Sequence, residues 1–238
     1  KMAGTDKKTI TRSRILNYVI NNQITSKAEV SKNLNLSMPT VLSNINDLIA
    51  KGIIIETGEY ESTGGRKAKS IGINPSYRYS VGIVITANHV GIVLEIVKFR
   101  RVRMKFSPDA SYCQDLSVLT SEFLKDTEYQ DRILGIGISI PGIISQKAHL
   151  LIKSHALQLE NYSLSFLEQA FDLPVYFEND ANAAMMAEDM NRYKNAIYLS
   201  LNNTLGGAFC IGGKLFQGEN QKAGEFGHMI LVPGGRKC

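Results

Sequence analysis

The sequence lacks three features that would place the protein in a membrane or an oxidising compartment. Its longest apolar stretches, such as residues 133–144, are too short and too interrupted by glycine to span a bilayer. Residues 1–10 lack the apolar core of a secretory signal peptide. Three cysteines, Cys113, Cys210 and Cys238, are an odd number at wide spacing and do not describe a disulfide framework. We therefore expect a cytoplasmic protein with reduced thiols.

The charge of the chain is concentrated in its first third. With 238 residues, 44% of them hydrophobic and 21% charged, the chain has room for one small and one larger soluble domain. Residues 1–78 carry twelve Lys or Arg against six Asp or Glu, a net charge of +6, whereas the remainder carries −1. This asymmetry favours a nucleic-acid partner for the N-terminal part. On charge alone, a merely solvated surface remains an alternative.

Apolar residues at helical spacing predict three helices, over residues 12–22, 26–34 and 37–51. The second begins with a capping box, in which the Ser26 hydroxyl accepts from the Glu29 amide and Glu29 reaches back. Ser37 is the expected cap of the third helix, and Pro39 suits its first turn. Two short helices followed by a longer one are typical of a helix-turn-helix, whose last helix enters the major groove of DNA.

The start of the third helix supplies the predicted base-reading side chains, which we expect to lie off its apolar face. These candidate DNA-binding residues are Ser37, Met38, Thr40, Ser43 and Asn44. Asn44 can pair bidentately with adenine, although a solvated helix residue explains it as well. Because serine and threonine specify bases poorly, we expect much of the readout to lie elsewhere.

A β-hairpin over residues 53–73 is predicted to form a wing. Its loop, residues 62–67, contains paired glycines followed by Arg66 and Lys67, which are further candidate DNA-binding residues. Arg66 is placed to enter a narrow minor groove, whose negative potential attracts guanidinium groups. The alternative is that both cations only solvate a turn. We assign residues 1–74 to this winged helix-turn-helix domain.

From Tyr79 onward, glycine-punctuated apolar runs predict strands separated by helices. Strands are expected at residues 81–85, 90–97, 102–106, 133–140, 175–177 and 197–201, and helices at 116–125, 164–171 and 181–190. The pattern predicts an α/β domain with a mixed sheet over residues 75–238. Residues 90–106 form a run without proline, asparagine or aspartate that is far longer than the usual strand of about five or six residues. We therefore suspect a missing turn near Leu94 and Glu95.

Two polar motifs carry the chemistry of this second domain. Residues 178–184 read ENDANAA, and residues 224–228 read GEFGH, followed ten residues later by Cys238. Carboxylates accept from sugar hydroxyls and asparagine both donates and accepts, so such a cluster suits a ligand that is nearly all hydroxyl. The candidate sugar-binding residues are Asn179, Asp180, Glu225 and His228.

These motifs, with the GGR sequence before the second domain, resemble the ROK family of sugar kinases and sugar-responsive repressors. The resemblance runs from about Ser62 to the last residue and implies an actin-like (ribonuclease H-like) fold for the second domain. His228 and Cys238 match the first two ligands of the family's zinc site, H-x9-C-x-C-G-x2-G-C. Because the other two cysteines are absent, we expect an incomplete structural zinc site and a chain that is incomplete at its C-terminus.

The family's phosphate-binding loops are altered. ROK kinases carry Asp-x-Gly-Gly-Thr after the first strand, where this chain has Val84 to Asn88, and valine cannot ligate magnesium. The second loop, Gly-Thr-Gly-Ile-Gly-Gly in the family, reads NNTLGG at residues 202–207. Asp180 matches the family's general base, but without positioned ATP it is expected only to accept a hydrogen bond from a sugar.

The sequence therefore predicts a sugar-responsive transcriptional regulator, a repressor of carbohydrate uptake or catabolism genes, and not an enzyme. Its expected partners are double-stranded operator DNA, a monosaccharide or sugar-phosphate effector and further copies of itself, as a homodimer or higher oligomer; no membrane partner is expected. One alternative is a ROK sugar kinase with an appended DNA-binding domain. Another is a repressor controlled by a protein partner, with a vestigial sugar pocket.

Overall fold

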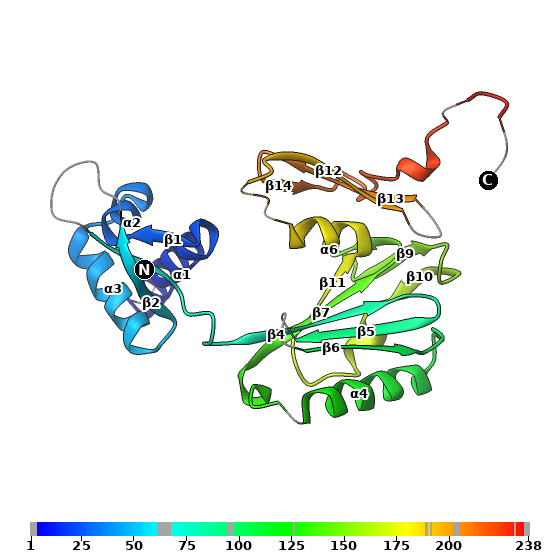
Figure 1. The fold of residues 1–238 in the computed structure, drawn as a ribbon, viewed down its shortest axis with the longest axis horizontal. Coiled ribbons are helices and arrows are strands. Elements are labelled where there is room, and N and C mark those ends of the chain that lie inside the picture. Colours follow the sequence, from blue (N-terminus) through cyan, green and yellow to red (C-terminus); the bar gives the residue numbers. More distant parts are fainter. Residues whose placement is uncertain are drawn as a thin grey trace. The chain divides into compact units, whose positions relative to one another are not determined.

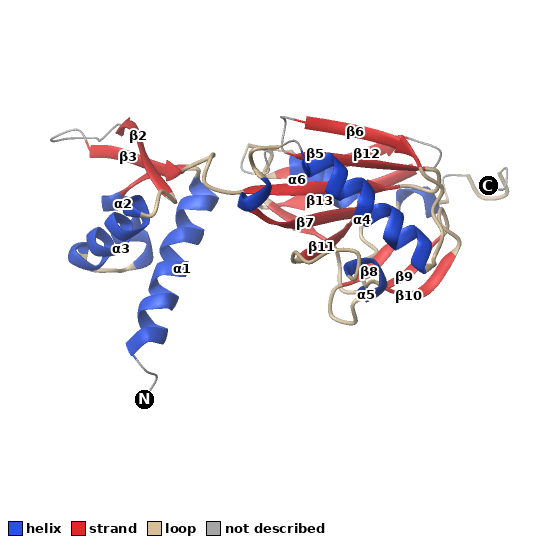
Figure 2. Ribbon diagram, turned by 90° about the horizontal axis from the view of Figure 1, so that it is seen from below, coloured by secondary structure: helices blue, strands red, loops and turns tan. Residues whose placement is uncertain are grey.

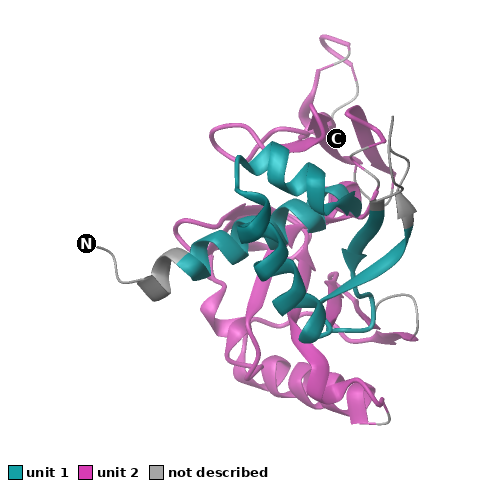
Figure 3. Ribbon diagram, turned by 90° about the vertical axis from the view of Figure 1, so that its left-hand side faces the viewer, with its two compact units in different colours: residues 1–78 teal, residues 79–238 magenta. Residues whose placement is uncertain are grey.

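The computed structural model describes residues 4–60, 68–94, 98–125, 127–188, 190, 192–201, 205–230 and 232–235. The chain divides into two compact units, residues 1–78 and 79–238, each considered by itself below (Figure 3). The sequence placed this division after residue 74. Within the described ranges, no helix is both long and apolar enough to cross a membrane.

The first unit is a winged helix (Figure 1). Its helices are α1 (Gly4–Asn22), α2 (Lys27–Leu34) and α3 (Met38–Ala50), and its strands are β1 (Ile24–Ser26), β2 (Ile54–Tyr60) and β3 (Ala68–Ile73). The strands pair antiparallel in the order β1-β3-β2. The three predicted helices are confirmed, although α1 begins earlier than the sequence pattern suggested.

The core of this unit consists of one apolar face from each helix, closed by the sheet. Its buried members are Ile15, Val19, Val30, Val41, Ile45, Leu48, Ile54 and Ile71. The helical members recur at intervals of three and four residues, which is the spacing that places side chains on one face of a helix. The core therefore fixes which face of α3 points outward.

Both predicted helix caps in this unit are confirmed. The Ser26 hydroxyl accepts from the Glu29 amide at 3.2 Å, and the Glu29 carboxylate accepts from the Thr25 hydroxyl at 2.8 Å. At the start of α3, the Ser37 hydroxyl accepts from the Thr40 amide at 3.4 Å. Such caps satisfy amides that the first turn of a helix leaves without partners.

The second unit is built on a five-stranded mixed sheet in the order β11-β7-β4-β5-β6. Its strands are β4 (Tyr79–Ile85), β5 (His89–Leu94), β6 (Lys98–Arg103), β7 (Ile133–Ile140) and β11 (Val175–Asn179). The first three form an antiparallel meander, while β7 runs parallel to β4 and β11 parallel to β7. The predicted mixed α/β architecture is confirmed.

The long apolar run at residues 90–106 is a hairpin rather than one strand. Residue Leu94 pairs with Lys98 across the β5–β6 ladder. Strands β5 and β6 are therefore antiparallel neighbours, and residues 95–97 between them lie outside the described part. The register therefore requires no additional residues, in contrast to the missing turn suspected from the sequence.

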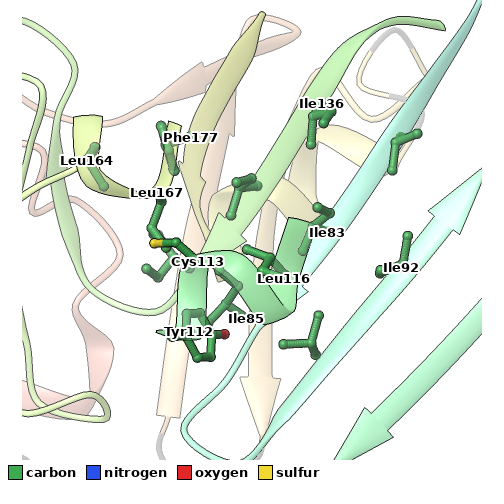
Figure 4. Close-up of a cluster of buried hydrophobic side chains, with 14 of the residues drawn as sticks. Ile83, Ile85, Ile92, Tyr112, Cys113, Leu116, Ile136, Leu164, Leu167 and Phe177 are labelled. Carbon is green, nitrogen blue, oxygen red and sulfur yellow. The ribbon is translucent and has the colours of Figure 1, made fainter. Parts of the chain in front are cut away.

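Helix α4 (Ala110–Lys125) covers one face of this sheet. Alternate residues of β4, among them Ile83 and Ile85, join Tyr112 and Leu116 of α4 in the main hydrophobic core. Figure 4 shows these side chains converging with Phe177 of β11. The period-two burial of β4 follows from the alternation of side chains along a strand.

The remaining elements of the second unit connect these strands or follow β11 (Figures 1 and 2). They are β8 (Ile143–Ser145), β9 (Leu150–Ser154), β10 (Leu159–Ser163), α5 (Ser165–Glu168), α6 (Asp180–Ala187), β12 (Asn195–Leu201), β13 (Leu205–Ile211), β14 (Lys214–Phe216) and the 3₁₀ turns η1 (Gln130–Arg132) and η2 (Phe226–His228). Strands β8 to β10 form one antiparallel sheet and β12 to β14 another. Helix α6 packs against β13.

Strand β13 was not predicted, because its paired glycines have low strand propensity. The packing explains them. A Cβ at Gly207 would collide with the Phe226 ring, and a Cβ at Gly224 would collide with the Gly207 carbonyl. Gly224 also has a φ of +91°, which glycine adopts readily. These two glycines let the GEFGH segment lie directly on β13.

Candidate functional site

The exposed face of α3 is the candidate DNA-binding surface of the first unit. Ser37, Met38 and Ser43 are exposed, as expected from the sequence. Thr40 is half-buried, and its hydroxyl oxygen lies 2.8 Å from that of Ser37. These side chains stand at the start of the helix that a helix-turn-helix inserts into the major groove.

The expectation that Asn44 lies off the apolar face is wrong. Its exposed fraction is 5%, its Nδ2 donates to the Thr40 carbonyl at 2.8 Å, and its Oδ1 has no hydrogen-bond partner among the described residues. The reason is helical periodicity: position 44 follows Val41 by three residues and precedes Leu48 by four, and both are core residues. Adenine recognition by Asn44 stays a prediction that requires this side chain to turn outward.

Two exposed residues of α3 were missed. Leu42, an apolar residue that was not among the candidates, is 38% exposed, and Asn46 is exposed as well. Leu42 follows Met38 by four residues and precedes Asn46 by four, so the three share one face. The sequence did contain a signal for this exposure: Val41, Ile45 and Leu48 already form the buried apolar face of α3, and Leu42 lies beside it.

Ion pairs shape the charge of this surface. The Arg12 guanidinium lies 2.7 Å from the Asp47 carboxylate, and the Lys8 ammonium lies 3.7 Å from it, so α1 neutralises the acid on α3. On the wing strands, the Lys69 ammonium lies 2.5 Å from the Glu56 carboxylate, and this hydrogen bond lowers the pKa of Glu56. The predicted wing residues Arg66 and Lys67 lie outside the described residues.

Asn179 begins the candidate effector site as the cap of α6. Its Oδ1 accepts from the amides of Ala181 and Asn182 at 3.0 and 3.1 Å. Its Nδ2 donates to the Gly142 carbonyl at 3.0 Å. Asn179 therefore holds the strand-to-helix turn, and this leaves Asp180, the exposed next residue, at the helix start.

Beneath this turn lies a buried carboxylate that sequence reasoning did not single out as a site residue. Glu178 is 6% exposed. Its oxygens accept from the Asn179 amide at 2.9 Å, from Asn182 Nδ2 at 3.0 Å, from Gln217 Nε2 at 3.2 Å and from the Tyr176 hydroxyl at 3.3 Å. Burial, reinforced by the nearby Glu178, raises the pKa of Tyr176. Four neutral donors thus satisfy this carboxylate.

The second motif presents its polar side chains from η2. The Glu225 carboxylate and the His228 imidazole nitrogen are 3.7 Å apart, and both side chains are exposed. The ring centroid of His228 lies 6.1 Å from that of His155, an exposed residue that follows β9. His155 was missed because no local motif surrounds it and only the fold places it beside His228.

A chain of contacts connects the two motifs. Asn179 binds the carbonyl of Gly142, whose backbone lies so close to Ser154 that a Cβ at position 142 would not fit. Ser154 is followed by His155, which lies beside His228. The start of α6 and the η2 turn therefore both border the end of β9.

Comparison with known proteins places this architecture in a family. The ROK family profile matches residues 82–238, more than half of the chain, and a winged helix-turn-helix DNA-binding profile matches residues 8–55. The chain belongs to the ROK family.

Among its relatives, this ROK chain is 31% identical to the xylose repressor of Caldicellulosiruptor bescii, over 94% of its own length and 59% of that protein. A crystal structure of a ROK family transcriptional regulator, a homologue of the Escherichia coli MLC protein, matches 97% of the chain and 61% of its own with a TM-score of 0.76 at 22% identity. A ROK hexokinase from Thermus thermophilus matches 67% of the chain and 56% of its own with a TM-score of 0.51 at 22% identity. The chain thus spans about three fifths of the length of these relatives.

The segment matched by sequence to the first kinase phosphate loop, residues 84–88, ends β4 and forms the turn to β5. Here the Thr86 amide and hydroxyl both donate to the His89 carbonyl at 3.0 Å, and the His89 amide donates to the Thr86 hydroxyl at 3.0 Å. These three donors are thus used within the turn. Val84 stands where the kinases have a carboxylate, and residues 202–204 of the second loop lie outside the described part.

The predicted zinc ligands are only partly described. His228 is exposed beside Glu225, and Cys238 lies outside the described residues. Within the described ranges, no cluster of three or more His, Cys, Asp and Glu side chains is arranged to hold a metal ion. Zinc binding therefore stays a prediction.

Proposed function

We propose that this ROK chain is part of a sugar-responsive transcriptional repressor that controls carbohydrate uptake or catabolism genes. The winged helix would bind operator DNA, and the ROK unit would bind a sugar or sugar phosphate that changes the affinity for DNA. The observation that carries the proposal is that a helix-turn-helix precedes a ROK unit with Val84 in place of the metal-binding aspartate and with the Thr86 amide bonded to His89. The similarity to a xylose repressor supports the same function.

The alternative, a sugar kinase with an appended DNA-binding domain, requires a metal ligand and free amides at the first phosphate loop. Val84 offers no ligand, and the Thr86 amide is bonded to His89. We therefore propose that the protein does not phosphorylate sugars. An ADP-release assay across hexoses, pentoses and N-acetylated sugars tests this, and turnover that Asp180→Asn abolishes would favour the kinase.

The proposed effector site comprises Asn179, Asp180, Glu225 and His228. Asn179 fixes the geometry of the turn, while the exposed side chains of Asp180, Glu225 and His228 are available to hydroxyl groups. If the pocket were vestigial and a protein partner controlled the repressor, no sugar would bind. Calorimetric titration with a panel of monosaccharides and sugar phosphates separates these possibilities.

Two further elements of the proposal concern assembly and metal. A short recognition helix reads few base pairs, so a homodimer on a palindromic operator is the favoured arrangement. A structural zinc ion would be held in part by His228 and Cys238, since imidazole and thiolate are ligands that zinc prefers. Metal analysis of the purified protein, compared with a Cys238→Ala variant, tests the zinc.

DNA binding itself is tested by gel shift with duplexes selected from a random-sequence library. We expect affinity to fall as salt rises, because each phosphate contact releases a counterion. Arg66→Ala should weaken binding by about 1–3 kcal/mol if the arginine enters a groove. Failure to bind any duplex at low salt would contradict the proposed function.

A further inference from the structure

The outward face of α3 has an unusual chemistry for a helix that reads DNA. Apart from Asp47, residues 38–50 contain no ionisable side chain. The helix therefore cannot make the bidentate arginine–guanine contact, the commonest base-specific contact in the major groove. Its exposed polar groups are small: hydroxyls of Ser37 and Ser43 and the amide of Asn46.

Two large apolar side chains occupy the same face. Met38 is 40% exposed and Leu42 is 38% exposed. They are four residues apart, so they are neighbours on the helix surface. Val41, Ile45 and Leu48 supply the helix's fully buried apolar side chains, and Met38 and Leu42 are not among them. The helix thus contributes to the core without Met38 and Leu42, and a lack of space in the core does not explain why these two side chains are exposed.

The charge arrangement allows this face to approach DNA. Asp47 would repel phosphates, but Arg12 and Lys8 of α1 pair with it. The attraction to DNA is supplied by the unit as a whole, since residues 1–78 carry a net charge of +6. The helix face itself is then neutral, with an apolar pair at its start.

In the major groove, the apolar group that the base pairs present is the C5-methyl of thymine. We infer that Met38 and Leu42 recognise thymine methyl groups, so that the operator carries thymines opposite the first turns of α3. This inference rests on the proposed DNA-binding function and specifies its base preference. Met38 and Leu42 would then supply the base specificity that the serine and threonine hydroxyls cannot.

The helix geometry limits the spacing of these thymines. Side chains four residues apart have Cβ atoms about 5–6 Å from each other. Successive base pairs rise by about 3.4 Å. Met38 and Leu42 therefore reach methyl groups that are one or two base steps apart.

The experiment exploits uracil, which pairs like thymine and lacks only the methyl group. A random-sequence duplex library is selected for binding to the protein, and the selected sequence is remade with single thymine-to-uracil replacements. Uracil at the positions facing α3 should weaken binding by about fourfold per methyl group, as expected for burial of one such group. Uracil elsewhere in the duplex should have no such effect.

Alanine variants test whether Met38 and Leu42 are responsible for this loss of duplex affinity. Leu42→Ala and Met38→Ala should weaken binding to the thymine duplex, and each should lose sensitivity to uracil at one position. Both side chains are exposed, so alanine at these helix positions is compatible with folding. Ile20→Ala, which removes an exposed apolar side chain of α1, is the matched control and should keep the full sensitivity.

Three results would overturn the inference. If duplexes bind but uracil has no effect at any position, DNA binding stands and methyl recognition fails. If Leu42→Ala and Met38→Ala both retain full uracil sensitivity, other residues read the methyl groups. If no duplex from the random-sequence library binds the protein, the proposed function and this inference fail together.

Discussion

The two helices that begin at the candidate sites, α3 and α6, are anchored in different ways. Helix α3 starts with a hydroxyl cap, Ser37, that serves one amide three residues along the chain. Helix α6 starts with Asn179, which serves two amides and binds Gly142, and it rests on the buried Glu178. Glu178 is in turn held by Gln217, which is 39 residues away in sequence. The first site is thus fixed by local interactions and the second by distant ones.

The largest effect is expected at Glu178. Glu178→Ala would leave the buried Asn182 amide, together with the half-buried Gln217 side chain and Asn179 backbone amide, without their acceptor, and an unsatisfied buried group costs about 1–3 kcal/mol. We expect the free energy of unfolding of the ROK unit to fall by about 3 kcal/mol, measured by denaturant titration followed by circular dichroism. Glu219→Ala, at an exposed position, is the control and should change it by less than about 0.5 kcal/mol. If Glu178→Ala and Glu219→Ala unfold with the same free energy, the buried Glu178 does not stabilise the second site as described.

Removing the cap of α6 should also lower the free energy of unfolding more than removing the cap of α3. Asn179→Ala removes the acceptor for two amides and a donor to Gly142, whereas Ser37→Ala removes the acceptor for one amide. We expect losses of about 2 kcal/mol and about 1 kcal/mol, respectively, within the range measured for helix caps. Denaturant titration of both variants checks this. A larger loss for Ser37→Ala would show that α3 depends on its cap more than α6 does.

A smaller effect is expected at the ion pair between α1 and α3. Arg12 and Asp47 have side chains that are 27% and 43% exposed, so solvent screening limits their contribution to about 1 kcal/mol or less. Arg12→Met should also weaken duplex binding, because Asp47 would then face the phosphates with less neutralisation. Adding Asp47→Asn should restore part of the affinity. If Arg12→Met binds DNA normally at low salt, the pair has no role in the charge of the surface.

The smallest effect concerns a charged cap, Asp109 at the start of α4. Hydrogen bonds from Ser107, Ser111 and the Tyr112 amide lower the pKa of Asp109 to about 2. Because the pKa is depressed in the folded state, this contribution to stability is complete above about pH 4, the usual pKa range of aspartate, and is lost as the pH falls toward 2. Asp109→Asn should flatten the pH dependence of unfolding in that window, whereas Ser37→Ala should leave it unchanged. An unaltered profile for Asp109→Asn would contradict the assignment.

Local signals explain which parts of the fold could be predicted. Ser26 and Ser37 indicate where two helices begin, because a cap residue binds an amide only three residues further along the chain. The strand at residues 133–140 was predicted with its observed limits, since its isoleucine and leucine residues recur at short intervals up to Ile140 and Pro141 follows. Strand β13 was not, because Gly207 is explained only by Phe226 and Gly224, which belong to a distant segment.

The site residues show the same division. Asn179 and Asp180 could be named from the ENDANAA motif, but the sequence did not reveal that Asn179 is largely occupied by the fold. His155 has no motif of its own and reaches His228 only through the tertiary structure. Asn44 was misplaced because its polar residue type suggests exposure, although its spacing from the core residues Val41 and Leu48 places it on the buried face.

The coupling between the two units is the central claim, and duplex affinity measured with and without each sugar of a panel tests it most directly. Linkage requires that a sugar which changes duplex affinity by some factor must have its own affinity changed by duplex by the same factor. We predict that one sugar or sugar phosphate produces this reciprocal shift, and that Glu225→Ala abolishes the shift while leaving duplex binding intact. If no sugar binds, or if a bound sugar leaves duplex affinity unchanged, the account of a sugar-responsive repressor is contradicted.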